Sequence, residues 1–102
     1  MDIHELTQAM HEFVTAKGWY EPGSIHPQTP RSLAISLALE ASEVLEHFQW
    51  KEHIEDTQAW TSELADVALY LLQLSQITGV DLEAAILSKL QTNYHRTWGN
   101  NE

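Results

Sequence analysis

The chain has no cysteine and very few basic residues. Its 102 residues include five Lys and Arg against fifteen Asp and Glu, which gives a formal net charge of −10. The absence of cysteine excludes disulfides and thiolate metal sites. The scarcity of Lys and Arg argues against a broad nucleic-acid-binding or membrane-binding surface, because both need clustered positive charge. We therefore expect neither nucleic acid nor membrane as a partner.

Long apolar runs and targeting signals are also missing. Charges interrupt every apolar stretch before it reaches the roughly 20 residues of a membrane span. The first residues, MDIHE, lack the basic and then apolar pattern of a signal peptide. At this length we expect one small domain over residues 1–102, in a cytoplasmic protein.

Strand signals are almost absent, whereas helix start and stop signals recur. Asp2 and Glu5 form a candidate capping box for a first helix, Thr29 and Pro30 open a second, and Asp56 and Asp81 can cap two more. The expected segments are a helix over residues 3–17, a loop over 18–29, a helix from 30 to about 50, a helix from 57 to Gly79, a helix from 82, and a tail over 97–102. The predicted fold class is all-α, a four-helix bundle.

The third predicted helix is apolar nearly all round between Leu64 and Leu74, where only Asp66 and Gln73 are strongly polar. A helix that is apolar on every side must be covered on every side. Three short companion helices in one small domain would not achieve this. We therefore expect a homo-oligomer, a dimer or a tetramer, in which a second copy covers the remainder.

Two pairs of carboxylates interrupt the apolar helices. Glu40 and Glu43 are three residues apart, and so are Glu63 and Asp66, so each pair shares one helix face. On neighbouring antiparallel helices the four groups would meet, and at that density they need a cation or a shared proton. Hard oxygen ligands suit Mg²⁺, Mn²⁺ or Ca²⁺. A solvated stripe is the alternative interpretation, but the apolar residues around Asp66 make it unattractive.

The few cations also form a pattern. Lys89, Asn93 and Arg96 lie at positions i, i+4 and i+7, which places two cations and an amide in a row on one helix face. Arg31 lies in a first helical turn, where the helix dipole disfavours it, so it is expected to have another partner. Ordinary surface polarity also explains the row. Beside a Mg²⁺ cluster, however, the row would suit a substrate with several phosphates.

Aromatic residues could complete a binding site. Tyr70 lies one turn beyond Asp66 and Trp50 two turns beyond Glu43, so both could stack on a flat base, although such residues are most often core or rim. No Glu-x-x-His spacing occurs, which argues against a ferritin-like di-iron bundle. No Gly-rich phosphate loop or nucleophile elbow is present.

The arrangement resembles a known family. Glu40-x-x-Glu43, nineteen residues and then Glu63-x-x-Asp66 is similar to the MazG-like superfamily of all-α nucleoside triphosphate pyrophosphohydrolases. The flanking phrases resemble its dCTP pyrophosphatase branch in particular. These phrases are PRSL at 30–33, FQWK at 48–51, EL-x-DV-x-x-YL at 63–71 and SKL-x-TN at 88–93. Two features depart from the family: Leu39 stands where the MazG pattern has a further glutamate, and the loop before Pro30 is longer.

The resemblance implies a role for each of these residues. Glu40, Glu43, Glu63 and Asp66 would be Mg²⁺ ligands, with Mn²⁺ as a possible substitute, and Glu43 is our choice for orienting the attacking water. Lys89 and Asn93 would contact phosphate or sugar, and Arg96 matches an arginine of the family. Trp50 and Tyr70 would belong to the nucleotide pocket, and Trp19 is the candidate for the base-contacting aromatic.

The implied activity is hydrolysis of a (deoxy)nucleoside triphosphate, dCTP-like or another non-standard or excess nucleotide, to its monophosphate and pyrophosphate. By family analogy this serves to clean the nucleotide pool. The alternatives are a relative acting on phosphoribosyl-ATP or dUTP, and a non-catalytic helical interaction module whose carboxylates are merely solvated.

Overall fold

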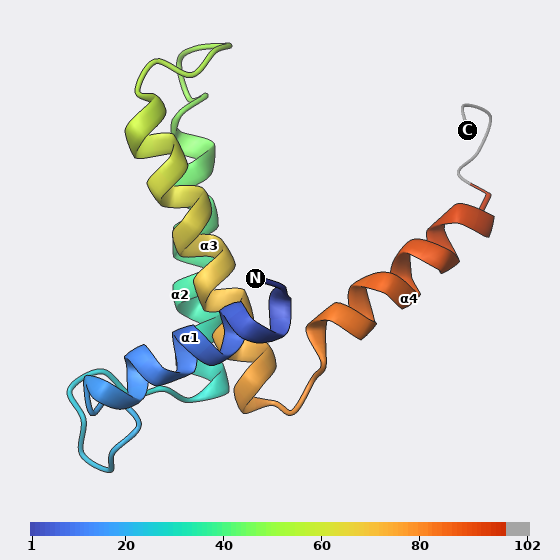
Figure 1. Cartoon of the computed structure of the whole chain (residues 1–102). Helices are drawn as coiled ribbons and strands as arrows, with labels where there is room; N and C mark the ends of the chain where they lie inside the picture. Colours follow the sequence, from blue (N-terminus) through green and yellow to red (C-terminus); the bar gives the residue numbers. More distant parts are fainter. Residues whose placement is uncertain (98–102) are drawn as a thin grey trace.

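The computed structural model describes residues 1–97, which form four helices joined by loops (Figure 1). The helices are α1 (Ile3–Ala16), α2 (Pro30–Glu46), α3 (Thr57–Ile77) and α4 (Leu82–His95). Residues 1–97 contain no strand, so the predicted all-α class is confirmed. The expected tail falls on residues 97–102, of which 98–102 lie outside the described residues.

Each helix begins at a capping side chain. The oxygens of Asp2, Thr29, Asp56 and Asp81 each accept a hydrogen bond from the backbone N–H three residues later, which satisfies one of the free donors of the first turn. At Thr29 the bond is reciprocal with Ser32, which makes a full capping box. α3 ends before Gly79, whose φ of +75° is the left-handed conformation that glycine adopts without strain. The four helix starts lie where the sequence predicts them.

The ends of two helices differ from the prediction. α1 stops at Ala16, one residue early, and α2 stops at Glu46, where we expected a helix to about Trp50. Phe48 and Gln49 bond back to carbonyls three residues earlier, at 2.9 and 3.2 Å, so the chain tightens into turns instead of continuing the helix. As a result, Trp50 lies beyond the helix and is 85% exposed.

The main body is an antiparallel pair, α2 and α3, with α1 crossing it near the end where α3 finishes (Figure 1). Met10 and Val14 from α1 and Leu72 from α3 form the buried core cluster, and the side chains of Ile3, Trp19, Tyr20 and Leu82 pack against it. The α2–α3 pairing sets the two carboxylate-bearing helices side by side. No helix in the described residues is both long and apolar enough to cross a membrane.

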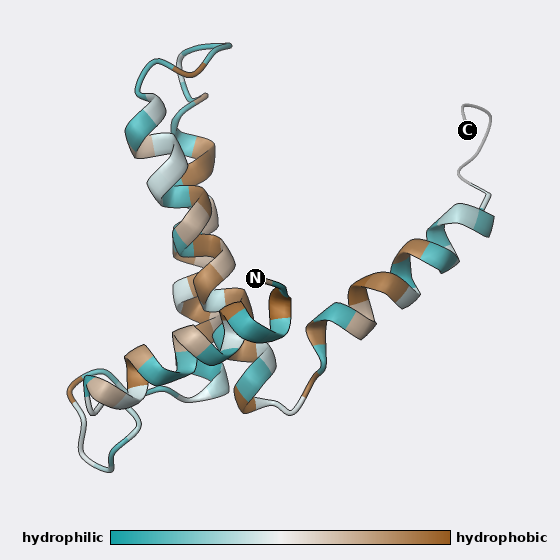
Figure 2. Cartoon of the chain, in the orientation of Figure 1, coloured by the Kyte–Doolittle hydropathy of each residue, from teal (hydrophilic) through white to brown (hydrophobic). Residues whose placement is uncertain are grey.

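α4 leaves this body instead of joining the bundle (Figure 1). Within the described chain, its main helix contact is with α1, at the start of α4. None of the residues of α4 is buried. Apolar residues recur along its length (Figure 2), including Leu87 and Leu90, which are 59% and 55% exposed. The single chain therefore leaves uncovered a helix that carries an apolar face.

Candidate functional site

The four carboxylates predicted from their spacing come together between α2 and α3. Glu40 and Glu43 lie on α2, and Glu63 and Asp66 lie on the adjacent turns of α3. The pKa of Glu40 is raised above its ordinary value of 4.5, first by burial, then by a hydrogen bond with Glu43 and by the negative charges of Glu43, Asp66 and Glu63. Each of the other three groups is thus close enough to act on Glu40.

The surroundings of Glu40 fit a cation. Its Oε2 atom is buried, and among the described residues it has no hydrogen-bond partner. A buried carboxylate oxygen without a donor is costly unless a cation or a proton compensates it. Together with Glu43, Glu63 and Asp66, whose charges act on it, Glu40 offers oxygen ligands of the kind that a hard divalent cation such as Mg²⁺ or Mn²⁺ prefers.

His47 also belongs to this cluster, although the sequence pattern did not single it out. It caps the C-terminus of α2, and its Nε2 atom lies against Oε2 of Glu63. Its imidazole ring meets the edge of Trp60 with 5.3 Å between ring centroids and 84° between planes. A signal for it exists in the sequence, because His47 lies four residues after Glu43 and therefore shares its helix face.

A cavity of about 810 Å³ opens beside the carboxylates. Its walls come from α1, the loop over residues 18–29, α2 and α3. The lining residues that matter here are Phe13, Trp19, His26, Gln28, Asp66, Tyr70 and Gln73. Asp66 therefore belongs both to the carboxylate cluster and to the wall of the cavity. Trp19 and Tyr70, which the resemblance assigns to the nucleotide pocket, also lie in that wall.

The long loop is held against the cavity by specific contacts. Trp19 packs edge-on against Phe13, with ring centroids 5.6 Å apart, and against His26 at 5.2 Å. From α3, the buried amide of Gln73 donates a hydrogen bond to Oε1 of Gln28. Gln28 in turn donates to the backbone carbonyl of His26 at 2.5 Å. These contacts fix an apolar, aromatic wall with a few polar groups, the usual character of a small-molecule site.

Several predicted binding residues lie away from the cluster within one chain. Trp50 is exposed and does not line the cavity, because α2 ends four residues before it. Arg31, in the first turn of α2, is also exposed and outside the cavity wall. Lys89, Asn93 and Arg96 lie on or next to α4, which leaves the body of the chain (Figure 1). Within one chain, the predicted phosphate contacts and the carboxylate cluster therefore lie on separate parts of the fold (Figure 1).

Comparisons with known proteins point to one family and one fold. A family model described as the MazG-like family matches residues 35–102. dCTP pyrophosphatase 1 of Rattus norvegicus is 34% identical over 92% of this chain, and that of Homo sapiens is 33% identical over the same share. The chain spans 58% of the length of each of these relatives. The crystal structure of a pyrophosphatase from Archaeoglobus fulgidus superposes with a TM-score of 0.74 at 29% identity, over 89% of this chain and 87% of that one.

Proposed function

The chain belongs to the MazG-like family, and from that premise we propose that it is a Mg²⁺-dependent pyrophosphohydrolase of (deoxy)nucleoside triphosphates. The substrate is converted to its monophosphate and pyrophosphate. The names of the relatives make dCTP the first substrate to test, followed by other non-standard or excess nucleotides. The physiological role we propose is to clean the nucleotide pool.

The position of Asp66 is the observation that carries this proposal. Asp66 belongs to the carboxylate cluster and also lines the cavity, whose wall contains Trp19 and Tyr70. A base and sugar held in the cavity would direct their phosphates past Asp66 toward the other carboxylates. A nucleotide consists of an aromatic base and a polyanionic phosphate tail. The aromatic cavity suits the base, and carboxylates that hold a cation suit the phosphates.

Glu40, Glu43, Glu63 and Asp66 would hold the metal. Bound there, Mg²⁺ or Mn²⁺ would neutralise phosphate charge and lower the pKa of an attacking water. The carboxylates themselves would hold that ion and keep the site negative enough to retain it. Glu43 is exposed, so we assign it the orientation of the water that attacks phosphorus.

The substrate's outgoing phosphates need positive charge, and we propose that a second copy of the chain supplies it. The solvent-accessible surface is 7806 Å², against about 5,800 Å² for a compact monomer of this mass. The radius of gyration is 16.5 Å, against about 13 Å for a compact chain of this length. Both values describe a protomer that has surface left to bury, which supports the predicted dimer or tetramer.

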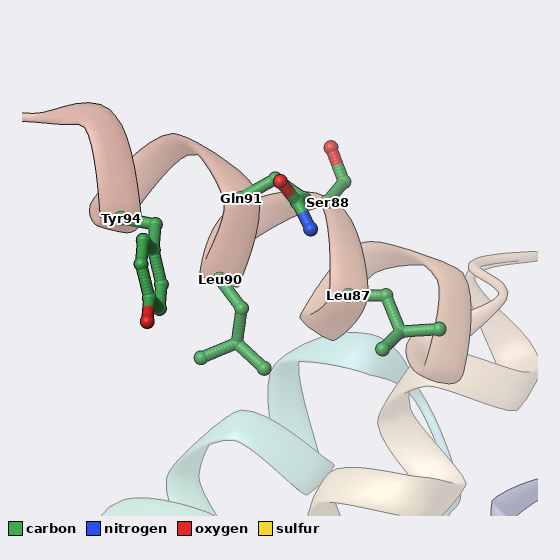
Figure 3. Close-up of a pocket in the computed structure, with 5 residues that line it drawn as sticks. All are labelled: Leu87, Ser88, Leu90, Gln91 and Tyr94. Carbon is green, nitrogen blue, oxygen red and sulfur yellow. The ribbon is translucent and has the colours of Figure 1, made fainter.

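The open face of α4 gives that second copy a place to bind. Leu87, Leu90 and Tyr94 point from one side of the helix, while Ser88 points from another (Figure 3). They border a hollow of about 570 Å³ that no other element of the described chain covers. If this side of α4 packs on another protomer, Lys89, Asn93 and Arg96 are brought to that protomer as well and can reach its phosphate site.

Two other functions compete with this one. A relative acting on phosphoribosyl-ATP or dUTP would use the same cluster with a different cavity occupant. A non-catalytic interaction module would need no metal, so its melting temperature would not change with Mg²⁺. The buried, unpartnered Oε2 of Glu40 favours the metal-binding alternatives.

A panel of nucleotides assayed by pyrophosphate release tests the activity. In ¹⁸O-labelled water we expect the label in the monophosphate, because attack at the α-phosphorus makes metal-bound pyrophosphate the leaving group. Asp66→Asn keeps the volume but removes a charge shared by the cluster and the cavity. This change should lower turnover by at least about 100-fold and weaken Mg²⁺ binding in calorimetry.

Glu46→Gln, an exposed change on α2, serves as the matched control and should leave turnover unchanged. Release of inorganic phosphate with a nucleoside diphosphate would contradict the proposed bond cleavage. Unchanged Mg²⁺ affinity in Asp66→Asn would refute the metal assignment.

A further inference from the structure

His47 makes a contact that the proposed reaction, as described so far, does not use. Its Nε2 atom hydrogen-bonds Oε2 of Glu63 across the α2–α3 pair, and the two side chains are only 13% and 24% exposed. A carboxylate oxygen accepts, so Nε2 carries the hydrogen and donates. Partial burial makes such a charge-assisted bond shorter and stronger than one in open water.

The imidazole ring is itself held in place. Trp60 lies edge-on against it, and Phe48 lies edge-on against Trp60 with ring centroids 5.5 Å apart. Phe48 follows His47 in the turn that ends α2, so the early end of that helix brings all three rings together. Because its neighbours restrict the orientation of the imidazole ring, the Nε2–H group points to one atom, Oε2 of Glu63.

The consequence falls on the other oxygen of Glu63. An exposed glutamate samples many rotamers, and holding it in one of them costs conformational entropy when it binds an ion. With Oε2 occupied by His47, the plane of the carboxylate is set before any ion arrives. No hydrogen bond within residues 1–97 engages Oε1, so that atom remains available to the space shared with Glu40.

We propose that His47 is a positioning residue that orients the Glu63 carboxylate for the divalent cation, a role that rests on the proposed function. Hydrogen-bond partners of metal-binding carboxylates typically contribute 10- to 100-fold in metal affinity. The competing interpretations are a purely structural link between α2 and α3, and a histidine that binds the ion itself. Substitutions that alter the donor and the volume separately distinguish all three.

The experiment measures Mn²⁺ and Mg²⁺ affinity by calorimetry on the full chain without nucleotide, with the melting temperature recorded for each variant. His47→Leu keeps volume and loses the donor, and should weaken Mn²⁺ binding about 10- to 100-fold. His47→Gln places an amide N–H near the position of Nε2 and should restore most of the affinity. His53→Leu is the matched control, because it removes a histidine 3.7 Å from Glu55 in an exposed loop; its affinity should equal that of the wild type.

Each other result has a defined meaning. Wild-type affinity in His47→Leu overturns the positioning role and leaves the proposed function standing, whereas absence of metal binding by the wild type refutes the proposed function itself. If His47→Gln loses as much metal affinity as His47→Leu, the positioning role is overturned, because the imidazole ring itself is then the ligand. If His47→Leu does not fold, His47→Asn decides, because its shorter amide cannot reach Oε2; affinity equal to that of His47→Gln would then overturn the role.

Discussion

Glu40 has the least favourable surroundings of the four carboxylates. Burial removes water from it, and three neighbouring negative charges oppose its ionisation. The folded chain therefore holds a proton on Glu40 more tightly than the unfolded chain does. The contribution of Glu40 to stability is greatest below its ordinary pKa of 4.5 and falls as the pH rises through the higher folded value. At neutral pH and without metal, the charge of this side chain opposes folding.

Removing that charge should stabilise the metal-free protein. We expect Glu40→Gln to raise Tm at pH 8 in EDTA by about 3–8 °C, since functional sites commonly hold such unfavourable groups. Added Mg²⁺ should raise the Tm of the wild type but not that of Glu40→Gln. Thermal scans of both proteins with and without Mg²⁺ check this, with Glu46→Gln as the exposed control. A lower Tm for metal-free Glu40→Gln would contradict the expectation.

At the residue scale, the sequence predicts what depends on helical spacing. Glu40 with Glu43 and Glu63 with Asp66 could be paired because the α-helical period fixes which residues share a face. Spacing places His47 on the face of Glu43, but not its contact with Glu63, because a contact between helices depends on their register. Trp50 was expected on the site face, but that expectation assumed four more residues of helix than α2 has.

His4 connects two elements that otherwise touch little. From α1, its Nε2 atom lies 3.0 Å from Asp81 Oδ1, and its Nδ1 atom lies 2.6 Å from Glu83 Oε2, both at the start of α4. The hydrogen bond and charge of Asp81, together with the charges of Glu83 and Asp2, raise the pKa of His4 above 6.5. With a proton on each ring nitrogen, the imidazolium bridges the two carboxylates and links α4 to α1.

This link should weaken with increasing pH. Because the folded pKa is raised, the stabilisation is fully present below about pH 6.5 and is lost as the pH rises through the folded value. We expect amides in the first turn of α4 to exchange faster at pH 9 than at pH 6, after correction for intrinsic rates. In His4→Gln this excess should disappear, and high salt should reduce it in the wild type. Equal corrected rates in the wild type at both pH values would exclude the link.

At the element scale, helix starts are predictable and helix directions are not. Asp56 and Asp81 cap α3 and α4 as expected, because capping is a local interaction between a side chain and the next turn. The end of α2 at Glu46 has no glycine or proline to mark it, and the turn at Phe48 packs against Trp60 from a distant helix. The direction of α4 depends on contacts such as that of His4, which spacing within one helix does not reveal.

The molecule as a whole has little buried interior. The buried apolar side chains in residues 1–97 are Met10, Val14, Leu33 and Leu72. A core of this size is small for a domain that must remain folded alone, so burial between copies is expected to complete it. The sequence predicts this need from the apolar character of α3, but not which surfaces meet, because that depends on the shape of the partner.

The face of α4 defined by Leu87, Leu90 and Tyr94 gives a direct test of assembly. We expect light scattering at micromolar concentration to give a dimer or tetramer. Leu90→Asp should shift it toward smaller species, because a charge at an apolar interface is costly to bury. Thr92→Asp adds the same charge at an exposed position of α4 that does not line this hollow, and should have a much smaller effect. A stable, folded wild-type monomer at these concentrations would contradict the assembly.

Because α4 extends away from the body of the chain, two variants should be able to complement each other. If the carboxylates of one protomer work with Lys89 of another, two inactive variants can complement each other. Asp66→Asn mixed equally with Lys89→Ala and allowed to exchange subunits would form hybrids in half of the pairs, each with one intact site. About a quarter of the sites, and hence of the wild-type activity, should then return from two proteins that have almost none apart. If each site is built within one chain, the mixture stays as inactive as its parts.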